Sequence, residues 1–390
     1  MRTNLFKLTA AAGVLALALT ACGSDDGGDD TDGALAGEGS GDDCVIDGEV
    51  AIGAALSLTG AAASYGESQK NGLELAAEQL NEKEGVTYAL TVEDDQTDPR
   101  QAISVFEGFA GDGTSLIIGP TLSNTAFQAQ PIAQEEGVPV LAISNTAAGI
   151  TEQGDYIFRN SLTEAQVIPQ TVAKSIETYG LENVVVMYSN DDAFTESGYE
   201  VMASSLEESD VTVADTLTFS KADTDFRALL TEAKNLNPDA IFVSGLIEAA
   251  IPLVTQAREL GIDVPIIGGN GFNNPQLMAD AGEAAEGVVV GAAWNSASDN
   301  AENTAFLADY EEKFGGQPDQ FAAQAFAALH IVDHAVREDC SADRDAITAG
   351  LGNITDLPTV LGSISINADR DAEHDAVVQV VKDGAFTVLP

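Results

Sequence analysis

The sequence predicts an α/β fold of two lobes, each built around a parallel β-sheet. Short runs rich in β-branched residues alternate with longer segments of helical spacing, a pattern typical of parallel strands joined by crossover helices. The alternation pauses at 156–159 and then restarts. Residues 44–390 are also long enough to form two hydrophobic cores. Together these observations favour two lobes of similar build.

Before the pause, the pattern predicts four strands and three helices. The expected strands are 50–58, 88–93, 116–119 and 138–143, and the expected helices are 68–83, 99–110 and 126–136. Asp98 directly precedes the second helix, where its carboxylate is expected to accept hydrogen bonds from the free N–H groups of the first turn.

After the pause, the same alternation predicts the second lobe. The expected helices are 165–179, 198–208, 226–235 and 249–260, and the expected strands are 184–188, 211–218, 240–244, 265–268 and 288–292. Two further helices are expected at 304–314 and 321–337. The chain is expected to end in a hairpin of strands around Lys382-Asp383-Gly384.

The first 43 residues have the composition of an export signal followed by a tether. Two basic residues precede an apolar run at 8–18, and Leu19-Thr20-Ala21-Cys22 resembles the lipobox of bacterial lipoproteins. We therefore expect residues 1–21 to be a signal peptide and Cys22 to carry lipid at the outer face of the cell membrane. A transmembrane anchor is the alternative, but the run is shorter than the about 18 apolar residues that a span needs. Residues 22–43 are acidic and rich in glycine, so they are expected to form a solvated tether.

The charge balance excludes nucleic acid as a partner. The chain has 16 Lys and Arg against 63 Asp and Glu, a net charge of -47, and cannot neutralise a phosphate backbone. Such acidity indicates a solvated, self-repelling surface, and we expect a monomer. The membrane is expected to be a partner only through the lipid.

Two cysteines remain in the part that is expected to fold, Cys44 near its start and Cys340 after a helix near its end. Outside the cytoplasm such a pair is expected to form a disulfide. Two free thiols are the alternative, because pairing cannot be proved from sequence.

A repeated tripeptide follows two neighbouring strands of the first lobe. Ser123-Asn124-Thr125 comes after the strand that ends at 119, and Ser144-Asn145-Thr146 comes after the strand that ends at 143. Ligands of parallel sheets bind outside the carboxyl ends of the strands. Hydroxyls and free N–H groups at that position favour an anionic group such as a carboxylate, whereas plain helix capping is the alternative.

Several segments of this chain carry a family resemblance. They are Ala55-Leu56-Ser57-Leu58-Thr59-Gly60 with Tyr65-Gly66, Asp94-Asp95 with Asp98-Pro99 and Gln101-Ala102, Ile118-Gly119 with Ser123, Gln256-Ala257-Arg258-Glu259-Leu260-Gly261, and 284–287. In these segments, and over nearly all of the part expected to fold, the chain resembles extracytoplasmic solute-binding proteins of ABC importers. The family is the branched-chain amino acid (Leu/Ile/Val-binding) one, which has the type I periplasmic-binding-protein fold.

The resemblance implies two Rossmann-like lobes, joined by a multi-strand hinge, that close on a small molecule and present it to an ABC permease. The N-terminal lobe would comprise 44–162 with 295–374, and the C-terminal lobe 163–294 with 375–390. A sensor that signals to a membrane partner is the alternative function on the same fold.

The resemblance also implies which residues of the first lobe hold the ligand. Its carboxylate would be held by Ser123 and Thr146, with backbone groups near Ser144. Tyr65 falls where the family places an aromatic wall, although a surface tyrosine on a glycine-rich turn is the alternative. Phe326 aligns with another wall residue and could instead belong to the core.

In the second lobe, the resemblance implies that aromatic side chains wall the ligand at two positions, near Phe194 and near Leu246. At the second position this chain has a leucine in place of the usual aromatic residue. Family members that bind α-amino acids carry an acid where this chain has Asn270. A neutral amide cannot balance a buried ammonium group. Either another acid, with Glu248 as the nearest candidate, replaces it, or the ligand is a carboxylate or amide without an ammonium group.

No pattern of residues indicates an enzyme or a cofactor. The chain has neither a nucleophile elbow nor a phosphate loop, and Gly269-Asn270-Gly271 lacks the third glycine of a dinucleotide site. His330 and His334 are spaced to share one helix face, but no third metal ligand is evident. We therefore expect neither catalysis nor a bound metal.

Overall fold

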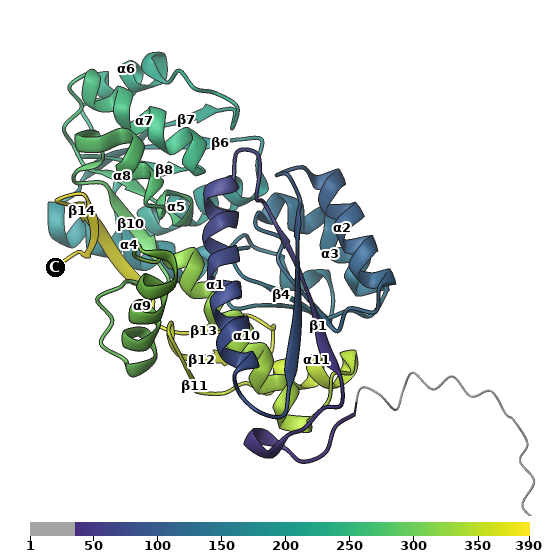
Figure 1. Ribbon diagram of the computed structural model, residues 1–390. Helices are drawn as coiled ribbons and strands as arrows, with labels where there is room; N and C mark the ends of the chain where they lie inside the picture. Colours follow the sequence, from purple (N-terminus) through teal and green to yellow (C-terminus); the bar gives the residue numbers. More distant parts are fainter. Residues whose placement is uncertain (1–35) are drawn as a thin grey trace, which may run out of the picture.

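The computed structural model describes residues 36–390 and shows two lobes lying side by side (Figure 1). Each lobe has a β-sheet with helices on its faces, as the sequence predicts. Within residues 36–390, no helix is both long enough and apolar enough to cross a bilayer. The predicted signal peptide and Cys22 lie outside the described residues.

The first lobe is built on five parallel strands in the order β2-β1-β3-β4-β5. These strands are β1 (Glu49–Leu56), β2 (Thr87–Asp94), β3 (Leu116–Ile118), β4 (Val140–Ala142) and β5 (Ile157–Arg159). The fifth strand lies where the sequence pattern pauses. The helices of the first lobe that come before the chain first crosses to the second lobe are α1 (Ala63–Asn81), α2 (Pro99–Gly111) and α3 (Ser123–Glu135). The side chain of Asp98 caps α2 as expected, accepting hydrogen bonds from the N–H groups of Arg100 and Gln101.

The second lobe is built on a sheet of seven strands in the order β15-β14-β10-β9-β8-β6-β7. Its strands are β6 (Asn183–Ser189), β7 (Thr212–Phe219), β8 (Ala240–Ser244), β9 (Ile266–Gly268), β10 (Val289–Ala292), β14 (Val377–Lys382) and β15 (Ala385–Val388). The predicted C-terminal hairpin is β14 and β15, which join β10 in antiparallel pairing and make this sheet mixed. Its helices are α4 (Glu164–Tyr179), α5 (Ala193–Glu208), α6 (Arg227–Asn235), α7 (Ile247–Glu259) and α8 (Gln276–Ala281).

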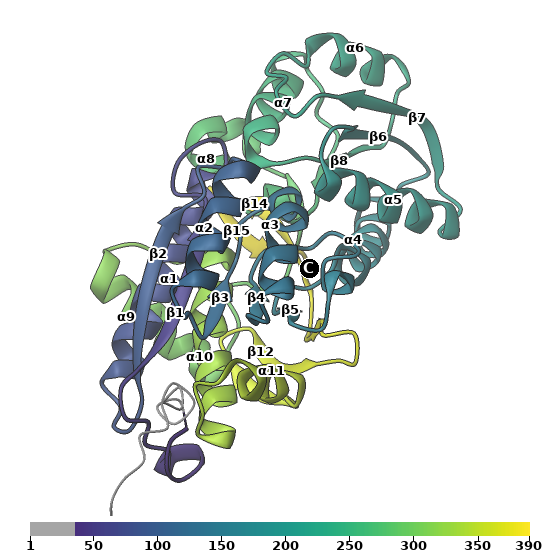
Figure 2. The same ribbon diagram turned by 90° about the vertical axis from the view of Figure 1, so that its right-hand side faces the viewer.

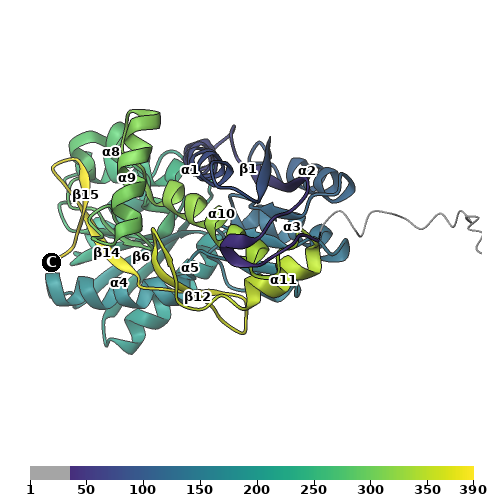
Figure 3. The ribbon, with the colours of Figure 1, turned by 60° about the horizontal axis from the view of Figure 1, so that its bottom comes forward.

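The chain returns to the first lobe before the final hairpin. The returning elements are α9 (Ala301–Phe314), α10 (Gln320–Asp339), α11 (Arg344–Gly352) and a small sheet of β11 (Leu357–Thr359), β12 (Gly362–Ile366) and β13 (Ala372–Glu373). Buried residues of α10 share one core with β1 and α1. Helices α1 and α10 pack so closely that a Cβ atom on Gly72 would collide with the backbone carbonyl of Ala322. Figure 3 shows the hairpin of β14 and β15 on the side of the second lobe.

Three crossovers therefore join the lobes, at 160–163, 293–300 and 374–376. Figure 2 shows the second-lobe sheet above the first-lobe sheet, with α3 and α5 on the facing sides. This arrangement is the two-lobed α/β fold that the sequence predicts. Strand β5, helix α8, helix α11 and the sheet of β11 to β13 were not predicted.

Two helices begin five residues earlier than predicted, α1 at Ala63 and α5 at Ala193. The first turn of α5 is stabilised by Asp192, whose side chain accepts hydrogen bonds from the N–H groups of Phe194 and Thr195. Helix α1 begins without a side-chain cap. Both first turns lie in the gap between the lobes, where tertiary contacts replace the apolar periodicity that sequence analysis relies on.

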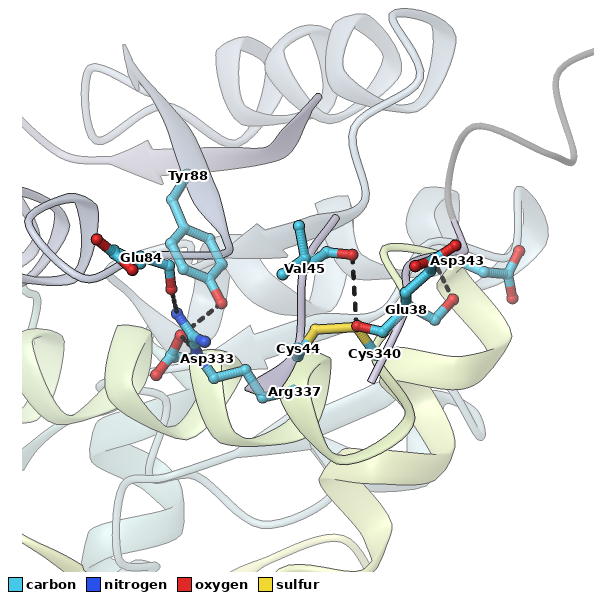
Figure 4. The surroundings of a disulfide bond; sticks show 10 residues. Glu38, Cys44, Val45, Glu84, Tyr88, Asp333, Arg337, Cys340 and Asp343 are labelled. Atoms are coloured by element: carbon cyan, nitrogen blue, oxygen red, sulfur yellow. Dashed lines mark hydrogen bonds and ion pairs between the residues drawn. A yellow bond between two sulfur atoms is a disulfide. The ribbon is translucent and has the colours of Figure 1, made fainter. Parts of the chain in front are cut away.

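Cys44 and Cys340 form the expected disulfide, with Cα atoms 5.3 Å apart (Figure 4). The segment just before Cys44, which was expected to be part of the tether, also contacts the fold. The N–H of Gly37 donates to the carbonyl of Cys340 at 2.8 Å, and Glu38 exchanges two backbone hydrogen bonds with Val45. The chain is thus fixed to the end of α10 from residue 36 onward.

Candidate ligand-binding cleft

The loops at the carboxyl ends of both sets of parallel strands line a cleft between the lobes. In the first lobe, these are the loops that follow β1, β2, β3 and β4, and in the second lobe they follow β6, β7, β8 and β9. In parallel sheets, side chains from consecutive loops meet at this edge. The cleft has two adjoining parts, which we call the inner and outer compartments.

The inner compartment is enclosed by residues of both lobes. It is lined by Tyr65, Thr121, Leu122, Ser123, Ser144, Asp192, Phe194, Leu246, Asn270, Gly271 and Phe321. Of the predicted site residues, it brings together Tyr65, Ser123, Ser144, Phe194, Leu246 and Asn270. The free space between their side chains is only about 20 Å³, which is room for roughly one water molecule. The lobes are thus closed on each other in this structure.

Helix α3 presents an uncapped N-terminus at the inner compartment. Its N-cap residue is Leu122, which makes no side-chain hydrogen bond to the first turn. Ser123 is the first helical residue, and its hydroxyl oxygen accepts a hydrogen bond from the N–H of Ala147 at 3.4 Å. That contact leaves the hydroxyl hydrogen of Ser123 able to donate. Free N–H groups and a hydroxyl donor at a helix N-terminus suit an anion, so plain helix capping does not explain Ser123.

The hydroxyl of Ser144 is held by the first lobe itself. It donates to the carbonyl of Thr121 at 2.6 Å and accepts from the side-chain amide of Gln69 at 2.7 Å. Gln69 also accepts a hydrogen bond from the hydroxyl of Thr121 at 2.7 Å. These bonds fix the loop that follows β3 against the loop that follows β4, so Ser144 shapes the compartment.

Two of the predicted site residues do not line the inner compartment. The hydroxyl of Thr146 points to the second lobe and donates to Oε1 of Glu164 at 2.6 Å. Phe326 packs in the core of the first lobe, its ring centroid 4.7 Å from that of Phe306. Phe321, which lies on the same helix, faces the compartment instead.

Tyr65 joins the two lobes at the edge of the inner compartment. Its hydroxyl donates to the carbonyl oxygen of Gly271 at 2.6 Å and accepts from the N–H of Ile247 at 2.8 Å. The ring lies 4.6 Å from that of Phe321. Burial, and then the nearby charge of Glu248, raise the pKa of Tyr65 well above its usual value, so the hydroxyl keeps its proton and donates.

Asn270 connects the inner compartment to a crossover through a chain of buried amides. Its Oδ1 accepts a hydrogen bond from the side chain of Gln320 at 2.6 Å. Oε1 of Gln320 accepts from the N–H of Ala293 at 2.6 Å and from the amide of Asn273 at 2.7 Å. The amide oxygen of Asn270 is therefore already engaged, and the side chain brings no charge to the compartment.

Acidic side chains do reach the cleft, but from other positions. Asp192 caps α5 with one carboxylate oxygen, and its other oxygen lies 3.7 Å from Nζ of Lys221. Burial raises the pKa of Asp192. Glu248 lies in the first turn of α7, and burial raises the pKa of its carboxyl to about 7.

Sequence reasoning missed five residues of the inner compartment: Thr121, Leu122, Asp192, Gly271 and Phe321. Thr121 and Leu122 directly precede Ser123, so their position after β3 was the available signal. Asp192 could have been found as the cap of a helix that begins after β6. The sequence gives no signal for Phe321, because apolar residues lie on every side of the first turns of α10 and do not indicate which side faces the cleft.

The outer compartment adjoins the inner one and shares Leu122, Asp192 and Leu246 with it. Its volume is about 470 Å³. The remaining first-lobe lining is Gly60, Ala61, Gln96, Thr97, Pro99, Asn124 and Thr125, and the remaining second-lobe lining is Lys221, Ala222, Asp223, Thr224 and Glu248. Within residues 36–390, no three His, Cys, Asp or Glu side chains are grouped to hold a metal ion.

Comparison with known proteins agrees with this architecture. A family model described as periplasmic binding protein matches residues 49–385. The Leu/Ile/Val-binding protein BraC3 of Rhizobium johnstonii is 25% identical over 329 residues, covering 83% of this chain and 89% of that protein. The crystal structure of LivJ from Streptococcus pneumoniae in complex with isoleucine has a TM-score of 0.82 at 28% identity and covers 87% of this chain and 98% of that one. The leucine-binding protein LivK of Thermotoga maritima has a TM-score of 0.83 at 25% identity, with 87% and 97% of the two chains covered.

Proposed function

This chain belongs to the periplasmic binding protein family, and we propose that it is a lipid-anchored receptor that captures a small organic solute between its lobes and delivers it to an ABC permease. The observation that carries the proposal is the inner compartment, whose walls come from both lobes. A solute there contacts both walls only when the lobes close around it, which needs more room than the about 20 Å³ in this structure. Binding therefore shifts the population toward the closed form, and the closed form is what a permease would recognise.

The chemistry of the inner compartment supports a solute with a carboxylate or amide head. The hydroxyl of Ser123 and the uncapped N-terminus of α3 supply donors for such a group. Phe194, Leu246 and Phe321 supply apolar surface for the rest of the molecule. BraC3 is a Leu/Ile/Val-binding protein and LivJ was solved with isoleucine, so aliphatic amino acids and the corresponding carboxylic acids are the first solutes to test.

The test is a thermal-shift screen of amino acids, amides and carboxylates, guided by mass spectrometry of solutes that copurify with the protein. A solute that binds only the native state raises its melting temperature. For a carboxylate hit, Ser123→Ala should weaken binding about 10- to 100-fold in isothermal titration, because a charge-assisted hydrogen bond contributes about 1.5–3 kcal/mol. Ser204→Ala, at an exposed position on α5, is the matched control and should bind normally. Unchanged affinity of Ser123→Ala would refute this assignment of the anion site.

The lipid anchor is proposed from the sequence alone. Replacement Cys22→Ser should abolish incorporation of labelled palmitate and release the protein from the membrane fraction. Retention of the variant in that fraction would contradict anchoring through Cys22. Light scattering of the purified protein should give the mass of a monomer.

A further inference from the structure

A chain of hydrogen-bonded amide side chains runs from the crossover at 293–300 to the inner compartment. Its members, in order, are Asn295, Gln379, Asn273, Gln320 and Asn270, and the first four are buried. The bonds between neighbours are 2.6–2.7 Å long. An amide side chain accepts only through its oxygen and donates only through its nitrogen, so each bond fixes how the next member is oriented.

The orientation is set where the chain begins, at a backbone N–H group, which can only donate. The N–H of Ala297 donates to Oδ1 of Asn295 at 2.9 Å. The nitrogen of Asn295 therefore donates to Oε1 of Gln379, and the nitrogen of Gln379 donates to Oδ1 of Asn273. The nitrogen of Asn273 is left to donate to the next member.

Gln320 receives this orientation from two sides and transmits it to Asn270. Its Oε1 accepts from Asn273 at 2.7 Å and from the N–H of Ala293 at 2.6 Å, so its Nε2 is the atom that donates to Oδ1 of Asn270. Nδ2 of Asn270 has no hydrogen-bond partner within residues 36–390 and is not sealed from solvent. Because Asn270 lines the inner compartment, it presents a hydrogen-bond donor there.

The other hydroxyls and amides of the inner compartment add donors and no free acceptor. Three hydroxyls each donate to one protein group and accept from another, those of Tyr65, Thr121 and Ser144. The hydroxyl of Ser123 and the N–H groups at the start of α3 remain able to donate. Free donors therefore face the compartment from both lobes, Ser123 from the first and Asn270 from the second.

Asp192 is the one charged residue that lines the inner compartment, and its charge is balanced within the second lobe. Its Oδ1 accepts from the N–H groups of Phe194 and Thr195, and its Oδ2 lies 3.7 Å from Nζ of Lys221. An ammonium group placed beside Nδ2 of Asn270 would thus be buried against a donor, which is costly, whereas an oxygen atom there would be satisfied.

We propose that Asn270 is a specificity-determining residue, whose Nδ2 donates to a second oxygen of a carboxylate solute and excludes an ammonium group from that position. The inference rests on the proposed function, because it assumes that the carboxylate lies at Ser123. Since the compartment is small, the two acceptor groups lie close together in the solute. The chemical class is therefore a 2-oxo acid, in preference to the α-amino acid of the same skeleton. Gln320 is a positioning residue, since it acts on the solute through the orientation of Asn270.

The experiment is isothermal titration with pairs of compounds that differ only in the group at C2. The pairs are 4-methyl-2-oxopentanoate with leucine and 3-methyl-2-oxobutanoate with valine. The protein is tested as wild type, as Asn270→Asp and as Gln320→Glu. Two controls make the same chemical changes at exposed positions, Asn235→Asp and Gln317→Glu.

We expect the wild type to bind at least one 2-oxo acid tenfold or more tightly than its amino acid partner. Asn270→Asp puts an oxygen in place of the donor and should abolish or reverse this preference. Gln320→Glu cannot donate, so Asn270 must turn over, donate to the new carboxylate and present its oxygen to the solute. The preference should then be lost although the lining residues are unchanged, and both controls should keep it.

Equal affinity for the two members of each pair, or tighter binding of the amino acids by the wild type, would overturn the inference. A preference for the 2-oxo acid that survives Asn270→Asp would do the same. Thermal melting of each variant identifies one that has failed to fold, in which case the other variant and the preference of the wild type decide.

The outcome also separates this inference from the proposed function. If neither pair binds, or the amino acids bind better, while some solute binds in a manner that depends on Ser123, the receptor function stands and the role of Asn270 is wrong. If no solute of these pairs or of the thermal-shift screen binds at all, the proposed function fails with it.

Discussion

Tyr65 and Gly271 lie on different lobes, and the hydroxyl of the first donates a hydrogen bond of 2.6 Å to the carbonyl oxygen of the second. The same hydroxyl accepts from the N–H of Ile247, which begins a helix whose N-cap residue is a leucine without a capping side chain. A side chain of one lobe thus caps a helix of the other. The closed form consequently has contacts of its own, besides those that a solute adds.

Tyr65→Phe should shift the solute-free protein toward the open form. The substitution keeps the ring against Phe321 and removes both hydrogen bonds, which contribute about 0.5–1.5 kcal/mol each. The ratio of closed to open molecules should therefore fall roughly tenfold. Small-angle X-ray scattering should record a larger radius of gyration. Tyr179→Phe, at an exposed tyrosine, is the control, and equal radii for the two variants would contradict the closing role of Tyr65.

Glu164→Gln should stabilise the protein at neutral and alkaline pH. Burial raises the pKa of Glu164 from 4.5 to about 7. Because the folded pKa is the higher one, the stabilisation by the protonated form is complete below about pH 4.5 and is lost as the pH rises through 7. Glutamine is neutral throughout and can still accept from Thr146. Its free energy of unfolding should exceed that of the wild type by up to about 3 kcal/mol at pH 8 and match it at pH 4.5.

Urea unfolding at several pH values measures this difference. Glu182→Gln, at an exposed glutamate, serves as the control. A difference between Glu164→Gln and the wild type that does not change with pH would show that the substitution acts through packing instead.

Removal of the disulfide should lower the free energy of unfolding by up to about 5 kcal/mol. The bond closes a loop between positions 296 residues apart, and in the chain-entropy model so long a loop gives one of the largest constraints on the unfolded state. The double variant Cys44→Ala, Cys340→Ala should unfold at lower urea concentration than the oxidised wild type. Reduction of the wild type should reproduce that loss, and a variant as stable as the oxidised protein would contradict it.

Asp371→Asn should destabilise the first lobe by about 3–5 kcal/mol. Arg159 is buried, its Nε donates to Asp371 at 2.6 Å, and its Nη1 donates to the carbonyls of Asn145 and Ala147. The substitution leaves this buried guanidinium without its counter-charge. Because Arg159 also holds the loop that carries Ser144, binding of a carboxylate should weaken as well. Asp369→Asn, at an exposed neighbour, should affect neither the unfolding free energy nor the titration.

The sequence predicted both lobes because buried parallel strands appear as β-branched runs with long helices between them. Helix α8 escaped because six residues give too few repeats to show a period. Cysteine pairing was predicted from the expected location of the protein outside the cytoplasm, not from the pattern of residues around Cys44 and Cys340.

The inner compartment was partly predictable for a physical reason. Ser123 and Ser144 follow neighbouring parallel strands, whose carboxyl ends must share one edge of the sheet. By contrast, Phe321 and Phe326 lie on a helix buried on nearly all sides, so the sequence cannot indicate which of them faces the cleft. The placement of Glu248 in the outer compartment depends on how the lobes close, which no local pattern records.

The attachment of Cys44 to Cys340 also determines how mechanical load enters the molecule. A pull on the chain that precedes Cys44 is transmitted across a covalent bond to the last turn of α10, and β1 is spared from being peeled off its sheet. The opposite end of α10 carries Gln320 and Phe321 at the cleft. Such a pull would thus pass along α10 and not along the strands of the first-lobe sheet.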